Sequence, residues 1–103
     1  MKPAVRWVAV LLLGGAALAG NTPGFQSLMD EAMARMHSGM AAAPMTGNAD
    51  QDFLAMMVPH HQGAVDAAKA ELLYGKNPQV KRLAQEILTE QALEIEYMRR
   101  LQN

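Results

Sequence analysis

The segment from about Asp50 to Tyr74 carries two adjacent rows of mainly apolar side chains, repeating at alternating spacings of four and three. Such spacing keeps side chains on one face of an α-helix, so this segment predicts a helix with a wide buried face. β-Branched residues are few, and no run alternates with a period of two, so no strand is predicted. The rows are Phe53, Met57, His60, Ala64, Ala67, Glu71, Tyr74 and Leu54, Val58, His61, Val65, Ala68, Leu72.

Pro59 falls inside this predicted helix. An interior proline removes a backbone hydrogen bond, so we expect a kink near Pro59. Alternatively, Pro59 opens a new helix and Val58 is the boundary. The residues predicted to face solvent repeat at helical spacing on the opposite side and are Asp52, Pro59, Gln62, Asp66 and Lys69.

An earlier helix is expected from about Pro23 to Ser38, with Thr22 as N-cap. Gly39 is predicted to end it. Residues 39–49 lack periodicity and contain glycine, proline and alanine, which is typical of a linker.

A third helix is expected after Gly75, with Asn77 as N-cap, Pro78 at the first helical position and an end near Leu101. The short connection makes it an antiparallel neighbour of the helix before it. The chain is therefore predicted to be all-α, a small antiparallel helical bundle of three main helices.

The N-terminus has the layout of a secretory signal peptide. Lys2 and Arg6 precede an apolar stretch over residues 7–13, and Ala17–Ala19 is a small-residue cleavage motif. We expect residues 1–19 to be removed, residues 20–49 to form a helix and linker, and residues 50–103 to form the hairpin core. The protein is then periplasmic or secreted and free of the membrane. An uncleaved anchor is the alternative, although the apolar stretch is short for one.

Composition narrows the classes of function. The formal net charge is −1 and no basic patch is present, so nucleic acid is not an expected partner. The chain has 9 methionines and no cysteine. Methionine is a flexible core filler, but its thioether is also a soft ligand for Cu(I) that cannot form a disulfide in an oxidising compartment.

Polar residues that interrupt the apolar rows of the middle and last helices are expected to lie at the same level of the bundle. His60 and His61 interrupt the rows of the middle helix, with Met56 and Met57 one turn earlier. The inner row of the last helix is interrupted in turn; it consists of Val80, Ala84, Ile87, Gln91, Glu94, Met98 and Leu101. Antiparallel pairing places His61 opposite Gln91, and Met57 between the levels of Glu94 and Met98. This cluster is either a structural polar network or a binding site.

The earlier helix adds a third set of candidate ligands. Met36, His37 and Met40 lie together at its end, next to the predicted linker. For Met29 and Met33, core packing explains the spacing equally well.

The segment from Phe53 to Leu101, with its His60-His61-Gln62-Gly63-Ala64 core and the later Gln91, Glu94, Ile95 and Met98, resembles the family catalogued as domain of unknown function 305. That family has a ferritin-like helical bundle and includes CopM-type periplasmic copper-binding proteins. The resemblance implies metal-binding or site-lining roles for Met57, His60, His61 and Met98, with Gln91 and Glu94 supporting. Many members have methionine where this chain has Ala67, so a ligand is either missing here or supplied by Met36, His37 or Met40.

Three hypotheses follow. The first is a periplasmic copper-binding protein, a metallochaperone or tolerance buffer, that favours Cu(I) over Cu(II), exchanges copper with another periplasmic protein and has no enzymatic activity. The second is a helical interaction module, with His60, His61, Gln91 and Glu94 in a buried polar network or a homodimer seam. The third is a small di-iron enzyme. Such a site requires Glu-x-x-His pairs as ligands, and this sequence lacks them.

Overall fold

The computed structural model describes residues 24–103 and consists there of three α-helices. They are α2 (Phe25–Ala42), α3 (Ala49–Tyr74) and α4 (Pro78–Leu101). The all-α prediction is confirmed. The predicted signal peptide and Thr22 cap lie outside the described residues.

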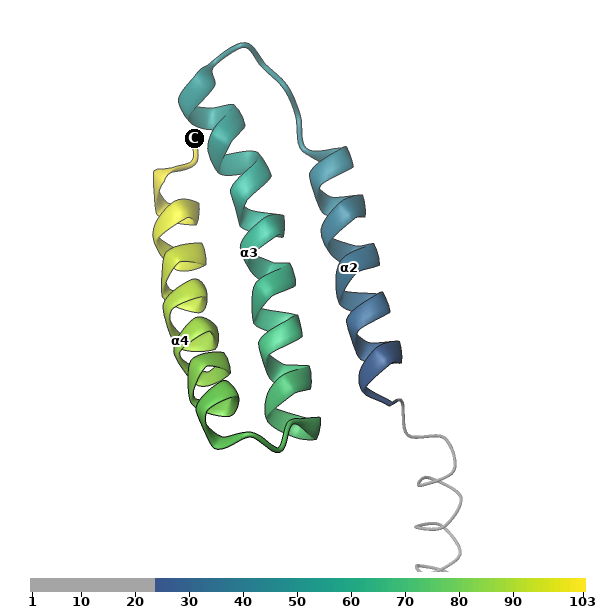
Figure 1. The fold of residues 1–103 in the computed structure, drawn as a ribbon. Coiled ribbons are helices and arrows are strands. Elements are labelled where there is room, and N and C mark those ends of the chain that lie inside the picture. The colour runs from purple at the N-terminus through teal and green to yellow at the C-terminus, as the bar shows by residue number, and fades with distance from the viewer. Residues whose placement is uncertain (1–23) are drawn as a thin grey trace, which may run out of the picture.

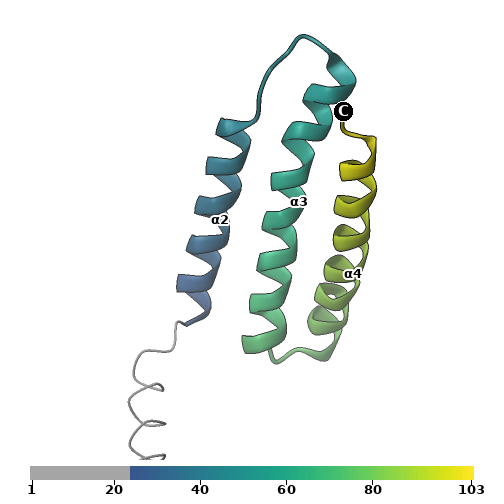
Figure 2. The same ribbon diagram turned by 180° about the vertical axis from the view of Figure 1, so that it is seen from behind.

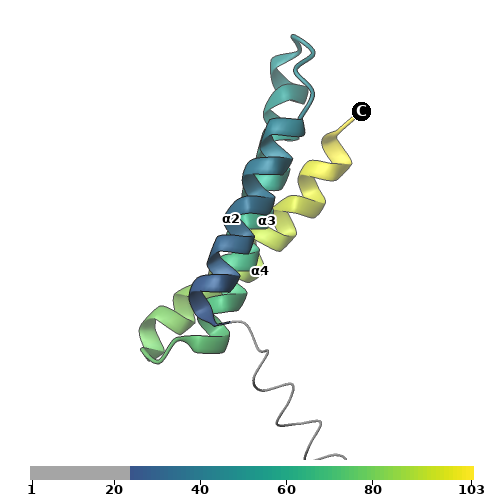
Figure 3. The ribbon, with the colours of Figure 1, turned by 90° about the vertical axis from the view of Figure 1, so that its right-hand side faces the viewer.

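The helices lie side by side, with α3 between α2 and α4 (Figure 1; Figure 2 shows the same arrangement from behind). Contacts join α3 to each neighbour, whereas within residues 24–103 none joins α2 to α4. Seen from the side of α2, α4 is inclined to α3 (Figure 3). The three helices therefore form a layer rather than a closed triangle, and α3 is open on both faces of that layer.

Local capping explains two of the helix starts. The side chain of Asn77 accepts hydrogen bonds from the backbone N–H groups of Gln79 and Val80, and Pro78 occupies the first turn of α4, as predicted. The Asn48 side chain accepts from Gln51 N–H at 3.1 Å and caps α3. Gly75 ends α3 as expected.

Two predictions about helix limits are wrong. α3 continues as one α-helix through Pro59, so Val58 is not a boundary. Gly39 does not end α2, which runs on to Ala42. Instead, Gly39 lets two helices approach, because a Cβ placed there would lie 2.7 Å from the Cβ of Pro59.

Two of the residues predicted to face solvent, Pro59 and Asp66, lie instead at the seam with α2, whereas Gln62 and Lys69 are exposed as predicted. Gly63 is buried at the seam, and a Cβ on it would lie 2.9 Å from Met36 Sδ. At the same seam, Arg35 Nη2 lies 3.2 Å from Asp66 Oδ2. Glycine and a proline ring replace large apolar side chains at this seam, which is why the apolar pattern did not reveal it.

The core lies on the other side of α3, between α3 and α4. Its buried members are Leu54, Val65, Ile95 and Met98, and partly buried Met57, Val58, Leu88 and Ala92 pack against them. α2 contributes one buried residue, Ala32. The buried cluster of the described residues thus lies between α3 and α4, and α2 packs on the opposite side of α3.

We predict that Gly63→Val weakens the seam between α2 and α3. The added side chain meets Met36 at its Cβ and Sδ, so overpacking lowers the free energy of unfolding by about 1–3 kcal/mol. Urea denaturation measures this change. Lys69→Val, at an exposed position of the same helix, is the control. An equal loss in both variants contradicts the close approach at Gly63.

Asp52 fixes the turn before α3. Its carboxylate accepts hydrogen bonds from Thr46 N, Thr46 Oγ and Gly47 N, at 2.9, 2.8 and 3.0 Å. The bonds from Thr46 hold the pKa of Asp52 below its usual value of 3.8. A lowered pKa means that this contribution to stability is complete above pH 3.8 and is lost as the pH falls through the folded-state pKa.

Asp52→Asn is therefore expected to lower the melting temperature at neutral pH and to flatten the acid limb of the stability profile. Thermal melts between neutral pH and pH 2 measure both effects. Asp50→Asn is the matched control, because no side-chain hydrogen bond of Asp50 is seen in the described part of the chain. If the melting temperatures of the wild type and of Asp52→Asn fall in parallel as the pH is lowered, the proposed contribution of the Asp52 carboxylate is contradicted.

Candidate metal centre

A histidine–carboxylate pair joins α3 and α4 beside the core. His61 Nε2 lies 2.7 Å from Glu94 Oε1. The His61 side chain is 16% exposed and that of Glu94 56%, so the imidazole is largely enclosed while the carboxylate reaches solvent. Glu94 is thus a direct partner of His61, and the predicted partner Gln91 takes no part in this bond.

The hydrogen bond to Glu94 places a hydrogen on Nε2 of the His61 ring. An ionised carboxylate only accepts, so Nε2 carries the hydrogen and donates it to Glu94. In the neutral ring, Nδ1 is then an acceptor with a free lone pair. Nδ1 is buried and has no hydrogen-bond partner.

Two methionines lie one helical turn from the His61–Glu94 pair along their helices. Met57 is one turn before His61 on α3, and Met98 is one turn after Glu94 on α4. Met98 is buried at 7% exposure, and Met57 packs against the cluster that contains it. The two methionines therefore occupy the bundle level adjacent to the His61–Glu94 pair.

His60 is not an interior residue, contrary to the prediction from its row. It is exposed, and its ring centroid lies 5.9 Å from that of His61, with the planes 57° apart. The predicted buried network of four side chains is accordingly reduced to the His61–Glu94 pair. Met56, which precedes His60 by one turn, is partly buried.

The candidate ligands of α2 differ in exposure and in what they pack against. Met36 packs on Gly63 in the seam with α3, and His37 is exposed. Met40 is partly buried and belongs to the helix, not to a linker. Because Gly39 lies against Pro59 and α2 is antiparallel to α3, Met40 is near the level of His60.

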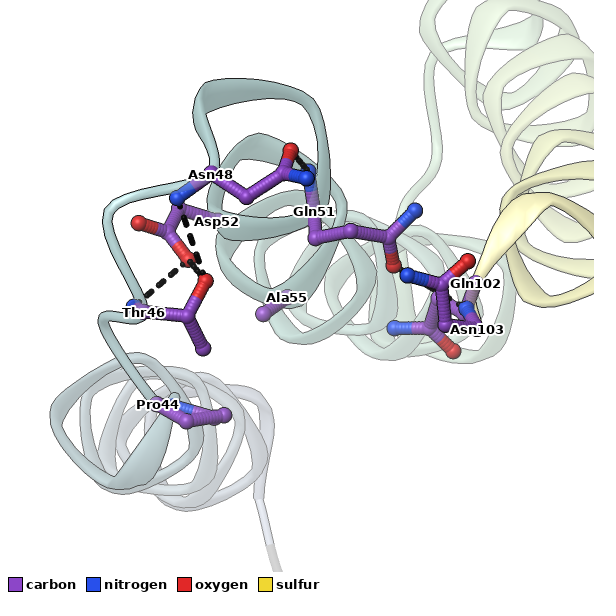
Figure 4. A pocket seen from close by; sticks show the side chains of 8 residues that line it. All are labelled: Pro44, Thr46, Asn48, Gln51, Asp52, Ala55, Gln102 and Asn103. Carbon is purple, nitrogen blue, oxygen red and sulfur yellow. Dashed lines mark hydrogen bonds between the residues drawn. The ribbon is translucent and has the colours of Figure 1, made fainter.

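A polar pocket lies apart from these residues, at the end of the layer where α3 begins (Figure 4). Thr46 and Asp52 meet on one side of it, and Gln51 accepts from the backbone N–H of Asn103 on the other. Its lining contains neither histidine nor methionine.

Hard ligands alone do not form a metal site in the described chain. Within residues 24–103, no three histidine, aspartate or glutamate side chains gather closely enough to hold a metal ion. By helical register, Met57 and Met98 are the methionines of α3 and α4 nearest to the His61–Glu94 pair.

Fold and site together define a small all-α bundle protein with a histidine–carboxylate pair set beside methionines. The chain belongs to the family described as Domain of unknown function (DUF305), whose model matches residues 9–102. The match takes in all three helices and thus extends beyond the segment on which the resemblance rested. A search of curated proteins found no match.

We predict that His61 is held in the Nε2–H tautomer. Nitrogen-15 NMR of the imidazole should show a protonated Nε2 and a free Nδ1 at neutral pH. Glu94→Ala should mix the two tautomers, because the acceptor that fixes the proton is gone. Glu90→Ala, at an exposed position one turn earlier on α4, should leave the spectrum unchanged. An Nδ1–H signal in the wild type is incompatible with this assignment.

Proposed function

We propose that this protein binds a soft metal ion, Cu(I) in preference to Cu(II), at His61 Nδ1 together with the sulfur atoms of Met57 and Met98. The observation that carries the proposal is the buried Nδ1 lone pair without a partner. Leaving such a group unsatisfied costs about 1–3 kcal/mol, and a metal ion bound to it removes that cost.

Glu94 supports this role in a way that is common in metal sites. A ligating histidine usually donates its other ring N–H to a carboxylate, which fixes the tautomer and makes the ligand more basic. The His61–Glu94 bond has this geometry. The supporting role predicted for Glu94 is therefore that of an orienting residue, not a ligand.

The donor set favours Cu(I). Thioether sulfur is a soft ligand that suits Cu(I), and neutral imidazole accepts copper in either oxidation state. The absence of cysteine from the sequence leaves methionine as its soft donor. His60, Met56 and Met40 are near the same level of the bundle and are proposed as an outer set through which copper reaches His61. Met36 is less suited, because it fills the α2 seam, and within residues 24–103 a ring contact with His61 is made by His60 but not by His37.

The cellular role proposed here is copper carriage or buffering outside the cytoplasm, by binding rather than catalysis. It depends on export by the predicted signal peptide. Over residues 24–103, no helix combines the length and apolar character needed to cross a membrane. A periplasmic protein that gives or receives copper is the expected partner.

The interaction-module hypothesis stays as the second candidate, because the His61–Glu94 bond also ties α3 to α4 without metal. The two hypotheses differ in what occupies Nδ1. A structural pair leaves it empty when copper is added, whereas a metal centre fills it.

Competition for Cu(I) against a chromogenic chelator tests the proposal. Replacing Met57, His61 and Met98 together by Leu, Ala and Leu should abolish most of the competition, and Glu94→Ala alone should weaken the affinity about 10–100-fold. Met45→Leu, at an exposed linker methionine, is the control. Unchanged competition by the triple variant, with its helix content intact by circular dichroism, rules out this site.

A further inference from the structure

The layer leaves one face of the α3–α4 hairpin uncovered and apolar. We call it the hairpin face, and it contains an open groove between the two helices. Its apolar lining consists of Ala64, Ala67, Ala68 and Ala84 together with Val80, Leu83 and Ile87. Glu71 is the one charged residue of that lining and lies at its end, over Gly75.

The opposite face of the hairpin has a different character. Half of the residues that line the hollow there are polar or charged, namely Gln62, Lys69, Thr89, Glu96 and Arg99; the other half are Val65, Leu88, Ala92, Leu93 and Ile95. Polar and charged side chains of this kind suit contact with water. The hairpin face, by contrast, exposes Val80 at 46% and Leu83 at 54%. Contiguous apolar surface of this sort marks an interaction site.

We infer that the hairpin face is the interface between two copies of this chain, which together form a four-helix bundle. The inference does not rest on copper binding. It rests on the complementarity of the face with itself: α3 offers a row of small residues at Ala64 and Ala67, and α4 offers a row of large ones at Leu83 and Ile87.

A two-fold axis parallel to the helices matches these rows. It lays α3 of one copy over α4 of the other at the same level, so Leu83 and Ile87 of the second copy fill the alanine row. Toward the start of α3, exposed Phe53 then meets Leu101 of the second copy. Between these apolar ends, exposed His60 comes opposite the exposed carboxylate of Glu94 of the second copy. The alanine row, Phe53 and His60 thus each have a suitable counterpart on the second copy.

The size of the face is adequate for a dimer. α4 has 24 residues, so it is about 36 Å long. Two packed helices are about 20 Å wide, which gives roughly 700 Å² per copy. Stable interfaces bury about 800 Å² per partner.

Light scattering after size-exclusion chromatography, without added metal, tests the inference. The purified chain should have twice its monomer mass at micromolar concentration. Leu83→Glu should shift it to the monomer mass, because the charge enters the apolar row. Leu93→Glu is the matched control, since Leu93 is on the same helix, is 60% exposed and lines the opposite hollow.

Circular dichroism of both variants checks that the helices are retained. A wild-type protein of monomer mass overturns the inference. The same result is expected if residues 1–23 of the same copy, and not a second copy, cover the face. A dimer that survives Leu83→Glu, or that is lost with Leu93→Glu alone, overturns it as well. Copper binding is measured separately, so its failure leaves this outcome unaffected.

Discussion

The structure depends on α3 being packed on two opposite sides by helices that do not touch each other. One seam is made by close approach, with Gly39 against Pro59 and Gly63 under Met36. The other is made by the apolar core of Leu54, Val65, Ile95 and Met98. Because α3 is the shared element, both seams determine where its histidines lie. His61 faces the α4 side, and His60 is left on the open face of the layer.

This arrangement explains why adjacent histidines differ so much. His61 has one nitrogen bonded to Glu94 and the other buried without a partner. His60 is exposed 5.9 Å away. One imidazole is thus preorganised by its neighbours, and the other is available to whatever approaches the face. The proposed metal centre is built on the enclosed His61, and the exposed His60 lies on the face of the proposed dimer interface.

Sequence reasoning succeeded where the signal was local. Asn77 and Pro78 specify the start of α4 through capping and a fixed backbone angle, and the structure agrees. It failed at Gly39, because glycine both ends helices and lets them approach, and only the position of Pro59 decides between these roles. It also missed the α2 seam, since a seam of small residues lacks the apolar stripe that periodicity detects.

The hydrogen-bond partner of His61 could not be predicted from the backbone register of the two helices. Simple antiparallel pairing places Gln91 opposite His61, and the same rule correctly brings Gln51 to Leu101, whose carbonyl accepts from Gln51 Nε2 at 3.2 Å. Helical side chains lean toward the N-terminus of their own helix. In antiparallel neighbours, His61 and Glu94 therefore lean toward each other across almost one turn, which backbone register alone does not capture. The free Nδ1 follows from that bond, so it was equally out of reach of the sequence.

X-ray absorption at the copper edge of the Cu(I)-loaded protein tests the central claim most directly. We predict a first shell with both sulfur and imidazole nitrogen, and loss of the imidazole contribution in His61→Ala but not in His37→Ala. A first shell of nitrogen and oxygen only, or an imidazole signal that survives His61→Ala, would contradict a centre built on His61 Nδ1 and methionine sulfur.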